Sequence, residues 1–212
     1  MLEVDYALAI PVASQNYGYP TKGTPGRQGH SVVAIALHIT AGPLKPSLDW
    51  LRDPQSQVSA HYVVSKAGFI YQLVREADAA WSNGWRTLKT DGHATTLDEK
   101  RALYEPQESV DWISAALLGN VNPNLLTVSI ETEGVPGELR PPRQLTSIIE
   151  LMLDIRDRQA LLAIPNRVCG HNALDSINRP DCPGFDGKDW HAIYSAWLLP
   201  KWARLPATEA NE

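Results

Sequence analysis

Apolar residues recur along the chain in short runs that predict β-strands. Residues 32–39 form an apolar run with several β-branched members, which is typical of a buried strand. Residues 58–64 and 69–74 are also strand-like, and the short connection between them contains Gly68, which indicates a hairpin. Residues 127–131 form a further β-rich run. These segments predict a sheet that contains at least one antiparallel pair.

Helical periods alternate with these strands. Residues 46–51 predict a short helix that ends near Pro54, because proline disrupts a helix interior. Residues 144–162 carry apolar side chains at helical spacing. After Pro183, aromatic residues at spacings of four and three predict another helix: Trp190, Tyr194 and Trp197. We therefore expect an α/β fold, with a mixed β-sheet flanked by helices in a single domain.

Polar segments frame this domain. Residues 14–31 are rich in Gly, Pro, Ser, Gln and Asn, so we interpret residues 1–30 as an irregular N-terminal lead-in. The folded domain is expected to occupy residues 31–205. A polar insertion within it predicts helices near residues 97–104 and 108–118.

Length and charge narrow the possible functions. The 212 residues are enough for one domain with a substantial core. The formal net charge of −5, without a basic patch, argues against nucleic acid as a partner. No apolar stretch has membrane-spanning length, so we expect no integral membrane association. The first residues lack the basic region and apolar core of a signal peptide, so we expect synthesis in the cytoplasm.

Three residues have the chemistry of a zinc site. His38 closes the first apolar run, and His171 and Cys182 bracket a loop. Imidazole and thiolate are good zinc ligands, and three protein ligands leave a fourth position open for water, as in catalytic sites. No CxxC or HxxxH pair offers a fourth ligand. A disulfide between Cys169 and Cys182 is conceivable, but a cytosolic origin argues against it.

Five segments, in order, resemble the motifs of the N-acetylmuramoyl-L-alanine amidase type 2 family, which is related to the peptidoglycan recognition proteins. They are residues 37–42, the hairpin at 58–72, residues 78–84, residues 128–134, and the loop with Gly170, His171 and residues 181–184. The resemblance extends over residues 15 to 200. The lead-in segment at 16–20 also resembles a subgroup of phage and prophage lysins.

The resemblance implies one zinc ion held by His38, His171 and Cys182. It also implies hydrolysis of the amide bond between the lactyl group of N-acetylmuramic acid and the L-alanine of the stem peptide in peptidoglycan. Glu131 matches the family's catalytic glutamate, which would move protons between the attacking water and the leaving amine. Glu133 shares its strand face, because side chains alternate along a strand, so the residues by themselves leave both carboxylates able to reach the groove.

Further positions are candidates for contacts with the substrate. Arg179 lies three residues before Cys182, near the slot in which family members often have lysine, and could stabilise an oxyanion. The candidate substrate-binding residues are Trp81, Asn83, Thr40 and His61. For Trp81, stacking on sugar or peptide and filling the core both stay open. His61 is better interpreted as a hydrogen-bonded histidine behind the site or in the core than as a fourth ligand.

Other functions stay open. A metal-free recognition module would only bind peptidoglycan, but the presence of all three ligands favours catalysis. A cysteine hydrolase that uses Cys182 and His171 would leave His38 unexplained, and the Pro-Gly after Cys182 offers no helix N-terminus to activate a thiolate. Among amidases, a phage-type lysin is favoured over a cytoplasmic enzyme that recycles soluble anhydromuropeptides. We expect a monomer that reaches the cell wall by holin-type release and has no separate wall-binding domain.

Overall fold

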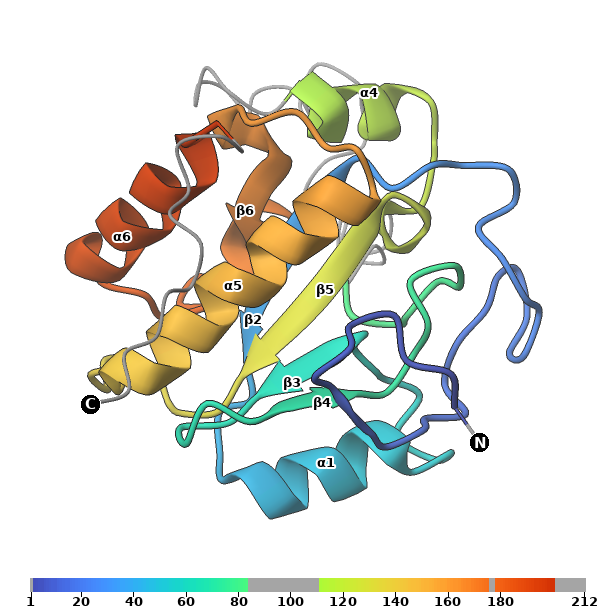
Figure 1. Cartoon of the computed structure of the whole chain (residues 1–212). Coiled ribbons are helices and arrows are strands. Elements are labelled where there is room, and N and C mark those ends of the chain that lie inside the picture. The colour runs from blue at the N-terminus through green and yellow to red at the C-terminus, as the bar shows by residue number, and fades with distance from the viewer. Residues whose placement is uncertain (1, 84–110, 176–177, 201–212) are drawn as a thin grey trace.

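A computed structural model describes residues 2–83, 111–175 and 178–200 (Figure 1). Its centre is a mixed six-stranded sheet with the strand order β1-β4-β3-β5-β2-β6. The strands are β1 (Ile10–Pro11), β2 (Ala34–Ile39), β3 (Tyr62–Val64), β4 (Ile70–Gln72), β5 (Thr127–Thr132) and β6 (Val168–Gly170). The predicted fold class, a mixed sheet flanked by helices in a single domain, is confirmed.

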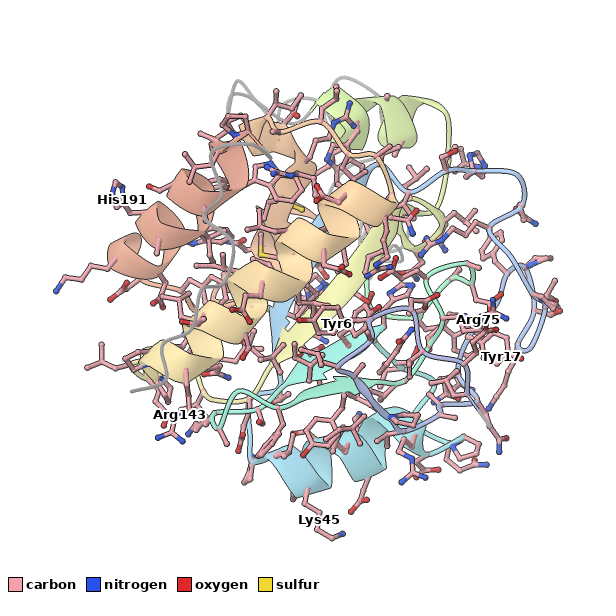
Figure 2. The ribbon with its side chains drawn as sticks, viewed as in Figure 1. Tyr6, Tyr17, Lys45, Arg75, Arg143 and His191 are labelled. Carbon is pink, nitrogen blue, oxygen red and sulfur yellow. The ribbon has the colours of Figure 1, made fainter. Side chains whose placement is uncertain are left out.

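Helices cover both faces of this sheet (Figure 1). The described α-helices are α1 (Leu44–Arg52), α4 (Asp111–Leu118), α5 (Pro142–Arg158) and α6 (Gly187–Leu198), and 3-10 turns occupy Pro123–Leu125, Pro165–Arg167 and His171–Ala173. α5 and α6 pack together on one face, where Trp197 is fully buried in the main core. α1 lies on the other face, where Leu51 joins a separate apolar cluster. Lys45 on α1 and His191 on α6 point away from the sheet (Figure 2).

Parallel pairing brings three strand ends to one edge of the sheet. β2 pairs in parallel with both β5 and β6, while β3 and β4 form the antiparallel hairpin. In the register of β2 and β5, His38 stands directly beside Glu131. Because the carboxyl ends of parallel strands open on a common edge, that edge is the expected place for a ligand site.

Side-chain alternation then selects the face on which the site lies. Leu37 of β2 and Ile130 of β5 belong to the core under α5, whereas Ala36 belongs to the apolar cluster of the opposite face. Since successive side chains of a strand point to opposite faces, His38 and Glu131 both point away from α5. The sheet therefore presents an imidazole and a carboxylate side by side.

Two strands are shorter than predicted. The segment predicted at 58–64 is a strand only from Tyr62, because the residues before it bind a loop: the Ser59 N–H donates to the Trp81 carbonyl at 3.1 Å. Its hairpin partner covers Ile70–Gln72 instead of 69–74. A loop partner far along the chain leaves no periodic signal, so the sequence pattern overestimates both strands.

Other boundaries also differ from the prediction. α5 ends at Arg158 rather than at 162, because Ala160 adopts a φ of 52°, a left-handed conformation that ends helices. The expected irregular lead-in contains the short strand β1, which pairs with β4. The helix predicted near 97–104 lies outside the described residues, and the one near 108–118 is described as α4. Among the described residues, no helix is long and apolar enough to cross a membrane.

Candidate active site

The three predicted zinc ligands meet at the carboxyl edge of the sheet. His38 lies near the end of β2, His171 directly follows β6, and Cys182 lies in the loop before α6. One ligand atom from each residue lies within 4.8 Å of the others, and all three side chains are buried. The two Nδ1 atoms of His38 and His171 are 3.0 Å apart, with the rings inclined by 58°.

The protonation states of His38 and His171 are compatible with a cation bound between the two rings. Burial, followed by the effect of His171, lowers the pKa of His38 well below its usual value, and burial lowers the pKa of His171 to about 4. Both imidazoles are therefore neutral at physiological pH and can offer a lone pair. The observed Nδ1 separation of 3.0 Å is close to the roughly 3.3 Å expected between two nitrogens at tetrahedral zinc.

The thiol of Cys182 completes this donor set. Burial, with a contribution from Glu131, raises its pKa to about 12, so without a metal it is a neutral thiol. A coordinated thiol loses its proton to the metal. Cys182 and Cys169 are both free and buried. Two imidazoles and one thiol thus fit zinc, with room for one further ligand.

Glu131 faces this cluster with an uncommitted carboxylate. Its Oε2 atom is buried and has no hydrogen-bond partner in the described part of the chain. Burial raises the pKa of Glu131 to about 7, an effect that the charge of Arg179 partly opposes. A carboxyl group with this pKa exchanges a proton close to neutral pH, as a general acid–base requires.

An open pocket of about 400 Å³ lies over the cluster. Glu131, His171 and Cys182 contribute to its wall, and so do the predicted substrate contacts Thr40 and Trp81 and the predicted oxyanion group Arg179. The Trp81 indole N–H donates to the Gly18 carbonyl at 2.7 Å, which fixes the ring at the rim. Arg179 is exposed beside the ligands. The pocket therefore brings together three neutral metal-binding groups, the carboxylate of Glu131 and the positive charge of Arg179.

Two predicted substrate contacts lie elsewhere. His61 is buried and does not line the pocket; its ring contacts Ser129 Oγ at 2.9 Å and Arg27 Nη2 at 2.8 Å. Asn83 is also buried outside the pocket wall, and its amide donates to Thr127 Oγ1 at 2.8 Å. We therefore exclude both from the groups that face a substrate, and the alternative interpretation of His61 as a hydrogen-bonded inner histidine fits its contacts.

Trp50 also belongs to the site, although no sequence motif singled it out. This residue of α1 is 58% exposed and lines the pocket, on the helix that follows the first ligand motif. A tryptophan on a short helix directly after a ligand motif was a detectable signal. Its exposure, however, depends on how α1 packs, which the local pattern does not reveal.

Known proteins share both sequence and fold with this chain. N-acetylmuramoyl-L-alanine amidase A of Achromobacter lyticus is 37% identical over 81 residues, which are 37% of this chain and 41% of that relative. The chain thus matches less than half of the relative's length.

Three solved structures show the same fold. An AmpD derivative has a TM-score of 0.59 at 19% identity, covering 91% of this chain and 99% of its own. AmiD from E. coli, solved with anhydro-N-acetylmuramic acid-L-Ala-D-gamma-Glu-L-Lys, has a TM-score of 0.52 at 22% identity, covering 78% of this chain and 59% of its own. A mutant endolysin from Bacillus subtilis has a TM-score of 0.53 at 17% identity, covering 90% and 96%. The N-acetylmuramoyl-L-alanine amidase family model matches residues 28–185, well over half of the chain, and the chain therefore belongs to this family.

Proposed function

We propose that this chain is a zinc-dependent N-acetylmuramoyl-L-alanine amidase, which hydrolyses the amide bond between the lactyl group of N-acetylmuramic acid and L-alanine in peptidoglycan. One observation carries the proposal: His38, His171 and Cys182 gather beside the uncommitted carboxylate of Glu131 in an open pocket. Family membership supports the choice of bond. The muramic acid–peptide ligand of the AmiD structure supports the substrate class.

The chain's own residues would share the chemistry as follows. His38, His171 and Cys182 hold the zinc, which when bound polarises a carbonyl and makes water more acidic. Glu131 accepts a proton from the attacking water and returns it to the nitrogen of the leaving L-alanine. Arg179 stabilises the negative charge that develops on the amide oxygen. Trp81, Trp50 and Thr40 contact the substrate along the pocket.

The alternative chemistries are less compatible with this site. A cysteine nucleophile requires a thiolate, but burial raises the pKa of Cys182 to about 12. A module that only binds peptidoglycan has no use for a buried, uncommitted carboxylate next to three metal ligands. Hydrolysis uses every one of these groups.

We further propose a lysin role, in which the protein acts on the intact wall as a monomer after holin-type release from the cytoplasm. The support is the resemblance of lead-in residues 16–20 to phage and prophage lysins. The endolysin from Bacillus subtilis shares the fold, as does AmiD with its soluble anhydro-N-acetylmuramic acid peptide substrate, so the fold does not separate this role from the recycling of soluble muropeptides.

Digestion of purified sacculi tests the proposal. New L-alanine amino groups should appear without new reducing sugar ends. A chelator should abolish this release and zinc should restore it. New reducing ends, or full activity in a verified metal-free sample, would contradict the proposal. Faster cleavage of soluble anhydromuropeptide than of sacculi would favour the recycling role over the lysin role.

A further inference from the structure

Two buried polar atoms close to the three metal ligands have no hydrogen-bond partner among the described residues. One is Nε2 of His38 and the other is Oδ1 of Asn83, and neither has a hydrogen bond of good geometry to any described residue. The two residues are only 1% and 5% exposed, so bulk water does not satisfy these atoms. A buried polar atom without a hydrogen-bond partner lowers the stability of the fold by about 1–3 kcal/mol, so two such atoms in one place require an explanation.

The arrangement of the two histidines determines whether Nε2 of His38 needs a hydrogen-bond donor or an acceptor. Its Nδ1 atom faces Nδ1 of His171 at 3.0 Å, on the side of the cluster. A neutral imidazole carries one proton, so if Nδ1 binds a cation, the proton resides on Nε2. Nε2 then becomes a buried N–H donor that needs an acceptor.

The hydrogen bonds of Asn83 determine which way its amide points. Its Nδ2 lies 2.8 Å from Thr127 Oγ1. The Thr127 hydroxyl donates its one proton to the Pro123 carbonyl at 3.0 Å, so it can only accept from Asn83. The Asn83 backbone is also held, since its N–H donates to Asn124 Oδ1 at 2.8 Å. The amide nitrogen is therefore committed, and Oδ1 remains as an acceptor on a fixed support.

This acceptor lies next to the His38 ring. The Asn83 side chain lies within hydrogen-bonding reach of the His38 imidazole. Because the Asn83 amide nitrogen is committed to Thr127, the group that it can offer to the ring is the acceptor Oδ1.

We propose that Asn83 is a positioning residue of the metal centre: its Oδ1 accepts the Nε2 proton of His38 and so keeps Nδ1 of His38 free and aimed at the metal. Partners of this kind fix the tautomer and the ring orientation of metal-binding histidines. The proposal rests on the proposed zinc function, and it replaces the predicted contact of Asn83 with the substrate.

The test compares zinc affinities of the full-length protein by competition with a chromogenic chelator. Asn83→Leu keeps the size of the side chain but removes the acceptor, and should weaken zinc binding by about 10–100-fold. Asn83→Asp keeps an acceptor and should bind zinc at least as tightly as the unmodified protein. The visible absorption of the Co²⁺-loaded protein should change for Asn83→Leu, because the ligand His38 loses its fixed orientation.

Gln144 on α5 provides a matched control. It is also a buried amide whose nitrogen is committed, to the carbonyls of Val64 and Glu133, while its Oε1 has no partner among the described residues. Gln144→Leu should lower the stability of the fold but leave zinc affinity unchanged. A loss of affinity in both Leu variants would mean that Asn83 acts only through general stability, and would overturn the proposal.

The outcomes separate this inference from the proposed function. If the unmodified protein binds no zinc, the proposed function fails. If it binds zinc and Asn83→Leu binds equally well, only the positioning role fails. Should Asn83→Leu not fold, Thr127→Val removes the group that orients the amide and should also weaken zinc binding; unchanged affinity in that variant would overturn the proposal.

Discussion

Glu131 and Glu133 lie two residues apart, yet their carboxylates have different partners. Glu133 follows β5 and accepts two backbone N–H groups, from Leu44 at 3.1 Å and from Lys66 at 2.7 Å. It thereby joins the start of α1 to the β3–β4 hairpin. Glu131 Oε2 has no partner among the residues that the structure describes, and its side chain lines the pocket. This difference supports the proposed proton-transfer role of Glu131, and it gives Glu133 the contacts of a structural residue.

Glu131→Ala should retain zinc but lose most of its activity. The side chain is not among the three ligands, so the metal site stays intact, whereas loss of a general acid–base lowers the rate by about 10²–10⁴-fold. Turnover on sacculi and zinc content should be measured on the same preparation. Near-normal turnover would move the proton-transfer role to another group, and loss of zinc would make Glu131 a ligand.

Glu133→Ala should instead destabilise the fold. It leaves the N–H groups of Leu44 and Lys66 without their carboxylate, and a hydrogen bond to a charged group contributes about 1.5–3 kcal/mol. Urea denaturation should show a loss in that range or above, with turnover per folded molecule reduced far less than in Glu131→Ala. A stable variant without activity would contradict this assignment.

The stability of the metal-free protein should reveal the raised pKa of Glu131. Its pKa is about 7 in the folded state, compared with 4.5 for a free glutamate. The folded state therefore binds this proton more tightly than the unfolded state, and the group becomes destabilising as the pH rises from about 4.5 to about 7. Glutamine cannot ionise, so Glu131→Gln escapes this effect.

Urea denaturation of both proteins in chelator tests this at two pH values. The stability gained by Glu131→Gln should be small near pH 4.5 and should grow to the order of 3 kcal/mol at pH 8, from 1.36 kcal/mol per pKa unit. A gain that does not depend on pH would mean that the carboxyl group titrates normally in the fold.

Much of this site was predictable from local sequence, and the rest depends on distant contacts. The order of the family motifs was enough to bring His38, Glu131 and His171 together. The apolar pattern predicted the strands of His38 and Glu131, but not the short strand β6 before His171. The roles of Glu133 and Asn83 were not predictable in that way. The amide partners of Glu133 lie 89 and 67 residues away, and Asn83 lies in an irregular loop without a period that tells inside from outside.

Asn16→Ala should test how the lead-in supports the pocket. The buried side-chain amide of Asn16 donates to the carbonyls of Asp53 at 2.8 Å and Val58 at 2.9 Å, and the backbone carbonyl of Asn16 accepts from Ser59 Oγ. Val58 and Ser59 line the pocket. The variant should lose about 1–3 kcal/mol of stability, because these buried carbonyls lose a donor.

The same variant should raise KM for sacculi more than it lowers kcat, since the pocket wall shifts while the metal cluster stays. Thr21→Val is the control, because Thr21 is an exposed lead-in residue that pairs with Thr24 at the surface. It should change neither stability nor KM. An unchanged KM in folded Asn16→Ala would show that the wall holds its shape without this residue.

Cys182→Ser should bind zinc more weakly and should lose activity as a consequence. A serine hydroxyl is far less acidic than a thiol, so it is a poor substitute for the thiolate of a zinc site. The unmodified protein should gain thermal stability on zinc addition, by about 2.7 kcal/mol when free zinc is one hundred times its Kd. This gain should shrink strongly in Cys182→Ser, and high zinc should restore part of the turnover. The Glu131→Ala protein should behave in the opposite way, with the full thermal gain from zinc and no recovery of turnover. If Cys182→Ser kept the full thermal gain, the third ligand would have to be another residue.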